Sequence, residues 1–362
     1  MENIYSVITA TGSYIPSKKV TNKDFLKNQF YDSEGKKFDK SNEEIIDRFE
    51  QITDIVERRY VSDNQVTSDI AYLAAKDALD SSDINYEELD YIIVAHNFGD
   101  VKANNKKSDF VPSLASRVKK KLGINNPETI CYDIPFGCPG WIQGMIQANY
   151  YIKSGDARRV MVIGAETLSR ISDPHDRDSM LYADGAGATI LEAVKSKEPV
   201  GILAHVSRSD TLNHAYMLWM DKSNNPDYKG NELFLKMNGR KLYEYALNTV
   251  PDVIKNSLER AKIRINDVSK VLIHQANAKM DEAILQRLFK LFKKNEIPSN
   301  IMPMTISKLG NTSVATIPTL LNLIFKEKLS NHLLRAGNVA VIASVGAGMN
   351  INSLIYKVPS NR

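Results

Sequence analysis

The sequence predicts an α/β protein in which helices and mixed β-sheets form layers, and three observations support this fold class. Short apolar runs alternate with longer amphipathic runs along the chain. The apolar runs suit strands buried on both faces, and the amphipathic runs suit helices. The 362 residues are enough for one large domain or for two fused halves of ordinary size. Alternation of this kind is typical of layered α/β folds.

Five apolar runs are predicted to form buried strands, and the first of them reads YIIVAH. They lie at residues 91–96, 160–165, 188–194, 271–274 and 339–344. Helices are predicted between them. One begins at a Thr-Ser pair that can cap it, and another follows a proline, which suits the first turn of a helix. The predicted helices cover residues 67–80, 140–154, 241–261, 280–294 and 313–326.

Polar and turn-rich segments break this rhythm. Residues 97–108 and 220–231 are predicted to be irregular insertions. The charged junction KSKEP offers the best place to divide the chain, which predicts an N-terminal half at residues 1–195 and a C-terminal half at residues 196–362. Both halves have the same rhythm of strands and helices, although residue identities show no repeat.

The composition excludes several classes of protein. The chain is 43% hydrophobic and 25% charged, as is ordinary for a soluble protein. Two cysteines do not make a disulfide framework, so a reducing compartment is expected. Neither a signal peptide nor an apolar stretch of membrane-spanning length is evident, which predicts a cytoplasmic location. A net charge of +4 does not indicate nucleic-acid binding but suits a small acidic partner.

Cys138 is the first candidate for chemistry, because it lies where a loop turns into the predicted helix at residues 140–154. A helix start offers unpaired amides and the positive end of the dipole, and both stabilise a thiolate, the nucleophilic form of cysteine. Gly140, Gly144 and Ala148 leave one face of this helix bare, so we expect another helix to approach it closely in a large core. These features indicate covalent acyl chemistry.

A structural interpretation of Cys138 stands beside the catalytic one, since a lone cysteine usually packs as a small buried hydrophobe. Cys131 provides a comparison, because it lies in an extended stretch with no helix start behind it. We interpret Cys131 as a core residue and Cys138 as a candidate nucleophile.

His274 ends a predicted strand and is followed by two amides, Gln275 and Asn277. A histidine in this position is often only structural, but the amide cluster suits a polar site in which a carbonyl group is held. Asn311 lies in the string GNTS before an apolar helix. It can either cap that helix or donate its amide N–H to an anionic oxygen beside His274.

Two glycine-containing strings carry weaker signals. Residues 345–348 (VGAG) follow a predicted strand. Either their backbone amides approach a ligand, or these residues form a simple turn. Residues 184–188 (DGAGA) lack the context of a dinucleotide-binding loop. Gly185 and Gly187 are therefore expected to mark a tight bend that enters the strand at Ala188.

In their order and spacing, these motifs resemble those of the thiolase-fold condensing enzymes, and most closely those of β-ketoacyl-acyl-carrier-protein synthase III. The resemblance covers nearly the whole chain. Besides the helix start at Cys138, it includes the strings at residues 176–177 (DR), 184–188 (DGAGA), 236–239 (KMNG), 274–277 (HQAN) and 310–313 (GNTS). It implies a thiolase-like fold, in which two similar halves form α-β-α-β-α layers.

The catalytic Cys-His-Asn set of this family falls on Cys138, His274 and Asn311. The resemblance implies that Cys138 takes an acyl group from a thioester, and that its backbone N–H and that of Ala347 bind the oxyanion. His274 and Asn311 then stabilise the enolate left when malonyl-acyl-carrier protein loses CO2. The enolate attacks the acyl group and gives a 3-oxoacyl-carrier protein, in fatty acid or related lipid biosynthesis. No metal and no cofactor is implied, because the substrates are thioesters of CoA or phosphopantetheine.

Several substrate contacts differ from the family pattern. Arg48 stands where a tryptophan stacks on the CoA adenine, whereas Arg177 keeps the other adenine contact. Val111 replaces a larger residue that closes the acyl pocket from the partner subunit, and Val345 replaces a phenylalanine at the C-terminal gate. The smaller residues favour a deeper, more open pocket and a longer or branched acyl group.

The remaining binding candidates lie near His274. Lys279 begins a row of Lys and Arg residues on the predicted helix at 280–294, which suits an acidic carrier protein but is equally typical of a solvated face. The resemblance places Lys279 near the mouth of the site. Asn277 belongs to the amide cluster described above. The resemblance also implies a homodimer, in which Val111 reaches the neighbouring site.

Two alternatives remain beside the synthase of fatty acid biosynthesis. One is a specialised ketosynthase or acyltransferase of a secondary lipid, pigment or polyketide pathway that uses a longer acyl donor, which the departures from the family pattern favour. The other is a non-catalytic subunit that binds acyl groups or carrier protein. Retention of all three catalytic residue types disfavours that second alternative.

Overall fold

Two β-sheets form the centre of the protein, and the computed structural model describes residues 2–360. The strands of the first sheet are β1 (Asn3–Tyr14), β4 (Tyr91–Ala95), β7 (Ile130–Ile134), β8 (Arg159–Thr167) and β9 (Asp184–Ser196). Their order is β1-β9-β8-β4-β7. Strand β4 pairs in parallel with β7 and β8, whereas β9 pairs antiparallel with β8 and β1.

The second sheet consists of β10 (Gly201–Ser209), β13 (Val268–Ile273), β14 (Val339–Gly346) and β15 (Asn350–Lys357). Their order is β10-β15-β14-β13, and only β13 and β14 run parallel. Every strand of the first sheet precedes every strand of the second in the chain. The division into two halves between residues 195 and 196 stays a prediction.

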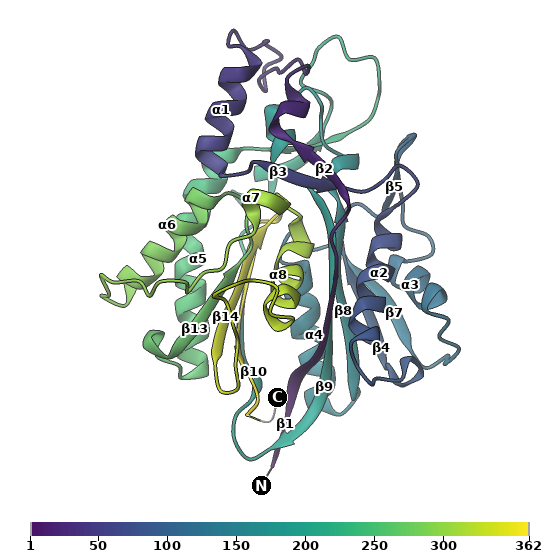
Figure 1. Ribbon diagram of the computed structural model, residues 1–362, viewed down its shortest axis with the longest axis vertical. Coiled ribbons are helices and arrows are strands. Elements are labelled where there is room, and N and C mark those ends of the chain that lie inside the picture. The colour runs from purple at the N-terminus through teal and green to yellow at the C-terminus, as the bar shows by residue number, and fades with distance from the viewer. Residues whose placement is uncertain (1, 361–362) are drawn as a thin grey trace.

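Six helices complete the layers: α2 (Thr67–Asp80), α3 (Leu114–Leu122), α4 (Gly140–Ser154), α5 (Gly239–Ala261), α6 (Ala278–Leu291) and α8 (Thr316–Phe325). Helices α4 and α8 lie between the sheets, α2 and α3 cover the first sheet, and α5 covers the second and carries α6 (Figure 1). This α-β-α-β-α order confirms the predicted thiolase-like fold.

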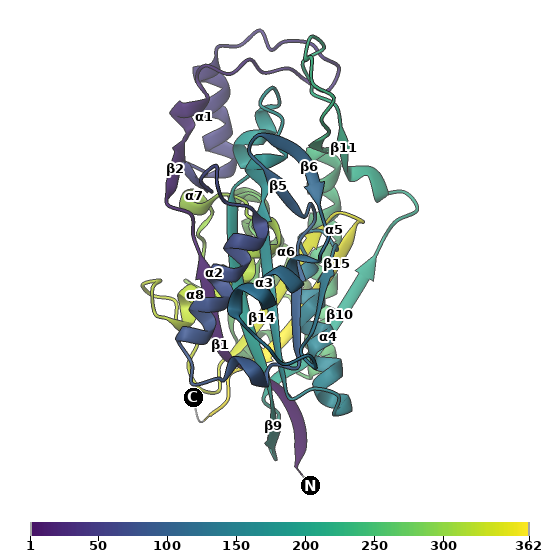
Figure 2. The same ribbon diagram turned by 90° about the vertical axis from the view of Figure 1, so that its right-hand side faces the viewer.

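Smaller elements gather toward one end of the layers, at the top of Figures 1 and 2. They are helix α1 (Asn42–Thr53), helix α7 (Ile306–Leu309), the pair β2 (Lys18–Thr21) and β3 (Glu57–Tyr60), the hairpin β5 (Asp100–Lys102) and β6 (Asn105–Asp109), and the pair β11 (Leu218–Asp221) and β12 (Phe234–Met237). Short 3₁₀ turns span Asn22–Phe25, Tyr86–Glu88, Leu168–Arg170, Arg177–Leu181, Ala215–Met217, Ile265–Asp267 and Ser313–Ala315.

All predicted strands and helices are present with small shifts at their ends, but several local predictions are wrong. Helix α2 has no Thr-Ser cap, because Val66 precedes it and donates its N–H to Asp69 Oδ2 at 2.9 Å. Gly185 and Gly187 form no bend, since both lie within β9. A Cβ atom on Gly187 would lie 2.6 Å from Thr319 N, so glycine here lets α8 pack directly on the sheet.

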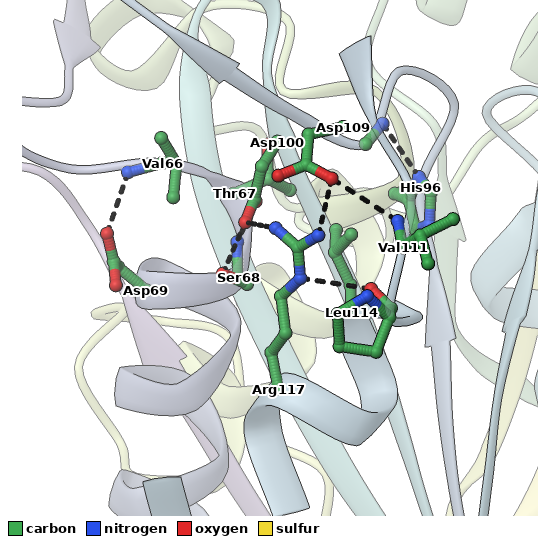
Figure 3. Close-up of polar contacts among 12 residues, drawn as sticks. Val66, Thr67, Ser68, Asp69, His96, Asp100, Asp109, Val111, Leu114 and Arg117 are labelled. Atoms are coloured by element: carbon green, nitrogen blue, oxygen red, sulfur yellow. Dashed lines mark hydrogen bonds and ion pairs between the residues drawn. The ribbon is translucent and has the colours of Figure 1, made fainter. Parts of the chain in front are cut away.

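The polar segment at residues 220–231 is largely the loop between β11 and β12, as predicted, but residues 97–108 form most of the hairpin β5–β6 instead of an irregular insertion. Arg117 of α3 holds both ends of this hairpin (Figure 3). Its Nη1 donates to Asp100 Oδ2 at 2.6 Å and its Nη2 donates to Asp109 Oδ1 at 2.7 Å. Ion pairing of both strands with Arg117 of α3 explains why so polar a stretch forms regular structure.

Helix α4 is buried, as predicted, but its bare face lies on strands rather than on another helix. A Cβ atom on Gly144 would lie 2.6 Å from Val162 Cγ1 in β8 and 3.5 Å from Ile93 Cγ2 in β4. Trp141, on the same helix, is only 1% exposed. Close contact with the sheet therefore explains the small residues and sets the position of the helix start.

We expect the substitution Gly144→Ala to destabilise the protein. Alanine normally stabilises a helix interior by about 1 kcal/mol relative to glycine, but the added methyl group would overlap Val162, and overpacking a core costs about 1–3 kcal/mol. Denaturant unfolding should show a lower free energy of unfolding. Gly239→Ala at the start of α5 is the control, because its new methyl would meet only Met237 Cε at 3.6 Å. Equal stabilisation of both variants would contradict this packing.

Candidate active site

The three residues predicted to carry chemistry line one pocket. Cys138 precedes helix α4, His274 follows strand β13, and Asn311 follows helix α7. The pocket walls are otherwise largely apolar, with side chains of Phe98, Leu168, Leu218, Trp219, Met220, Leu235, Met237, Leu242, Met280 and Val345. A pocket with apolar walls and a few convergent polar groups suits an organic ligand.

Cys138 lies one residue before Pro139, the N-terminal cap residue of α4. Ser313 Oγ donates a hydrogen bond to Cys138 Sγ at 3.3 Å. Burial nevertheless raises the pKa of the Cys138 thiol to about 11. The loss of water therefore outweighs the hydrogen bond and opposes the thiolate that we expect the helix start to stabilise, and that expectation stays a prediction.

His274 is 5% exposed, and its backbone N–H donates to Ala343 O at 2.9 Å, which ties it to the neighbouring strand β14. Burial lowers the pKa of the imidazole to about 4. The ring is therefore neutral near pH 7 and carries one N–H. Within residues 2–360, its Nδ1 atom has no hydrogen-bond partner.

Asn311 is held on both sides by backbone contacts. Its N–H donates to Leu181 O, and its carbonyl accepts from Ala183 N, each at 2.9 Å. Its side-chain Oδ1 accepts the Ser313 N–H at 2.9 Å. Because the oxygen is engaged in this way, the NH₂ group is the part of the amide left for a ligand in the pocket. Asn311 does not cap α8, since the residue before that helix is Ala315.

The backbone amides of Cys138 and Ala347 come together through two glycines. A Cβ atom on Gly346 would lie 2.4 Å from Cys138 N, and one on Gly137 would lie 2.7 Å from Ala347 N. Only residues without a side chain allow these two turns to approach so closely. Both Cys138 and Ala347 line the pocket, as the predicted oxyanion site requires.

Sequence reasoning missed Glu166, a fully buried acid at the end of strand β8. Its Oε2 atom accepts hydrogen bonds from Asn97 N at 2.9 Å and Asn97 Nδ2 at 2.7 Å. Asn97 Oδ1 in turn accepts the Gly137 N–H at 2.8 Å. This chain supports the turn that carries Cys138. Burial raises the pKa of Glu166 to about 7. The only signal in the sequence was an acid directly after a buried apolar run.

Of the predicted binding residues, Val345 alone lines this pocket. Arg48 is exposed on α1, and Lys279 is exposed on the first turn of α6. The guanidinium Cζ of Arg177 lies 5.4 Å from the centroid of the Phe38 ring. Val111 is 85% exposed beyond the hairpin β5–β6. The binding roles of these four residues stay predictions.

Asn277, the sixth candidate, has a structural role. Its Oδ1 accepts the Met280 N–H at 2.8 Å and so caps helix α6. It does not line the pocket, and a role in substrate binding stays a prediction. Within the described part of the chain, no group of three or more His, Cys, Asp or Glu side chains could hold a metal ion, and no helix is long and apolar enough to cross a membrane.

We expect alkylation of Cys138 by iodoacetamide to accelerate about tenfold per pH unit up to about pH 11, because only the thiolate reacts. Ser313→Ala should slow the reaction at each pH, since the hydrogen bond from Ser313 lowers the pKa of Cys138. The measurement needs a Cys131→Ala background, as burial also raises the pKa of Cys131 to about 11. A rate that levels off below about pH 8 would instead indicate the stabilised thiolate.

Comparisons with known proteins identify the family of this chain. The family described as 3-oxoacyl-[acyl-carrier-protein (ACP)] synthase III matches residues 132–211, and its C-terminal domain matches residues 258–358. The chain is 33% identical to β-ketoacyl-[acyl-carrier-protein] synthase III 2 of Halalkalibacterium halodurans, over 98% of each chain. It is also 33% identical to β-ketoacyl-[acyl-carrier-protein] synthase III of Ehrlichia canis, over 98% of this chain and 99% of that protein.

A solved structure supports the same assignment. The 3-oxoacyl-[acyl-carrier-protein] synthase III of Aquifex aeolicus superimposes with a TM-score of 0.78 and 30% identity, covering 97% of this chain and 99% of that one. The match therefore extends over both sheets and all three residues around the pocket. The chain belongs to the 3-oxoacyl-[acyl-carrier-protein] synthase III family of enzymes.

Proposed function

We propose that this enzyme condenses an acyl thioester with malonyl-acyl-carrier protein through an acyl group on Cys138, and releases a 3-oxoacyl-carrier protein. The observation that carries the proposal is the meeting of Cys138, His274 and Asn311 in one largely apolar pocket. A nucleophile alone would suffice for acyl transfer. The additional neutral imidazole and free amide donor suit an enolate, which condensation requires and simple acyl transfer does not.

In the first half-reaction, Cys138 Sγ attacks the thioester carbonyl. The backbone N–H groups of Cys138 and Ala347 stabilise the oxyanion of the tetrahedral intermediate. Collapse of that intermediate breaks the original C–S bond, and the thiol proton of Cys138 passes to the departing thiolate. Because the resting thiol is protonated, its proton leaves as the attack proceeds rather than beforehand.

In the second half-reaction, a malonyl thioester loses CO2 and leaves an enolate. The imidazole N–H of His274 and the side-chain amide of Asn311 donate hydrogen bonds to the enolate oxygen. The enolate carbon attacks the acyl group on Cys138, so a C–C bond forms and the C–S bond to the enzyme breaks. The released thiolate takes up a proton, since its pKa lies near 11. The proposed reaction involves no metal or cofactor beyond the CoA or phosphopantetheine of its thioester substrates.

The acyl donor that the pocket favours is longer than an acetyl group. Its walls, which include Leu168, Leu235 and Met237, suit an extended apolar chain. Val345 adds to the space of the pocket, because a larger side chain there would narrow it. The pocket therefore favours a specialised ketosynthase of a secondary lipid, pigment or polyketide pathway as the second candidate function.

We also propose that the enzyme is a cytoplasmic homodimer. The outer strand β7 leaves its edge free within the described chain, and Ile130 on that strand is 48% exposed. An exposed strand edge with apolar side chains is a natural surface for pairing with a second copy. The nearby Val111 would be covered by the partner, as would Phe110, which is 47% exposed.

We expect acyl-CoA or acyl-carrier donors to add the mass of one acyl group to the protein, as measured by intact mass spectrometry. Cys138→Ala should abolish this adduct. His274→Ala and Asn311→Ala should retain the adduct but lose at least about a hundredfold in condensation rate, since each removes an enolate donor. Full condensation by Cys138→Ala would exclude the covalent mechanism, and normal turnover by both other variants would exclude the enolate site.

Lys279→Glu is expected to raise the KM for malonyl-acyl-carrier protein about three- to tenfold at low salt, because it reverses a charge that faces an acidic partner. Turnover with malonyl-CoA should change little. Lys153→Glu, at the far end of helix α4 from Cys138, is the matched control. Equal effects of both variants, or an effect with malonyl-CoA alone, would contradict carrier docking at Lys279.

A further inference from the structure

Tyr182 places a hydroxyl group in the pocket wall without a partner. The residue lines the pocket and is 4% exposed. Its hydroxyl oxygen is buried and has no hydrogen-bond partner among residues 2–360. Buried tyrosine hydroxyls usually form a hydrogen bond, so an unsatisfied hydroxyl at this position needs an explanation.

The backbone on each side of Tyr182 is fixed to the catalytic segment. Asn311 pairs with Leu181 on one side of the tyrosine and with Ala183 on the other, each through a hydrogen bond of 2.9 Å. The ring is therefore held next to the reaction centre. The side chain is also closely packed, since the residue is only 4% exposed.

The ring of Tyr182 packs among apolar side chains, and its hydroxyl also interacts electrostatically with Cys138. Tyr182 belongs to a buried cluster with Leu168, and Phe98, Leu235 and Met237 pack against the same cluster. All four of these neighbours also line the pocket. Tyr182 thus contributes a polar hydroxyl group to a part of the pocket lining that is otherwise apolar.

The hydroxyl remains uncharged and so can both donate and accept. Burial raises the pKa of Tyr182 well above its ordinary value, and the nearby Asp178 and Asp176 add to the shift. The two oxygens that develop charge during the reaction already have donors, namely the amides of Cys138 and Ala347 for one oxygen and His274 with Asn311 for the other. The Tyr182 hydroxyl therefore remains available for a further polar atom of the substrate.

We infer that this enzyme selects an acyl donor whose chain carries an oxygen function, a hydroxyl or a ketone, which forms a hydrogen bond with the Tyr182 hydroxyl. The inference rests on the proposed function, since it concerns the chain attached to Cys138. A site that buries a hydrogen-bonding group discriminates strongly against an analogue that leaves the group unpaired. Tyr182 is therefore a specificity-determining residue.

The test compares the rate of Cys138 acylation by matched donors. The donors are CoA and carrier-protein thioesters of one chain length, either unsubstituted or with a single hydroxyl or oxo group at successive carbons. Wild-type protein should react at least about tenfold faster with one substituted donor than with the plain donor. Tyr182→Phe should remove that preference by slowing the substituted donor, while the plain donor reacts as fast or faster. Tyr86→Phe on the surface is the matched control.

The outcomes separate this inference from the proposed function. Equal preference in wild type and Tyr182→Phe, or equal slowing of plain and substituted donors by the substitution, would overturn the inference and leave the acyl-enzyme intact. A raised KM for the malonyl substrate with unchanged donor preference would assign the hydroxyl to the malonyl group and would also overturn it. Failure of every donor to acylate Cys138 would overturn both.

Discussion

The burial of the groups at one pocket is the constraint on which the chemistry of this protein depends. The same burial raises the pKa of Cys138 and lowers that of His274, so the resting site contains a neutral thiol and a neutral imidazole. Neutral groups avoid the high cost of a buried ion pair. They also leave the imidazole able to donate to an enolate, whose negative charge interacts more strongly in a site without water.

Backbone contact at glycines brings the separate parts of this site together. The turn at Gly137 meets the turn at Gly346, which places the amides of Cys138 and Ala347 side by side. A Cβ atom on Gly164 of strand β8 would lie 2.3 Å from Val314 O, so the segment that follows Asn311 lies directly on the first sheet. Segments that lie far apart in the chain can approach this closely only because no side chain separates them.

Several buried polar atoms near the pocket have no hydrogen-bond partner among the described residues, as do other atoms elsewhere in the core. They include Nδ1 of His274, Oε1 of Glu166 and the hydroxyl of Tyr182. Such atoms reduce the stability of the empty protein. A substrate that forms a hydrogen bond with the Tyr182 hydroxyl would recover part of the free energy lost on burying that group. The unsatisfied hydroxyl would then select for such a substrate.

The sequence by itself determined the layered α/β fold, most central strands and helices, and the trio Cys138, His274 and Asn311. These follow from the spacing of apolar residues and from local motifs, which do not depend on distant contacts. Tertiary structure alone decided the protonation of the site, because burial is a property of residues far apart in the chain. It also decided the hairpin held by Arg117, the support of Cys138 by Glu166 through Asn97, and the unpaired hydroxyl of Tyr182. Each of these depends on which side chains the fold brings together and which it leaves without a partner.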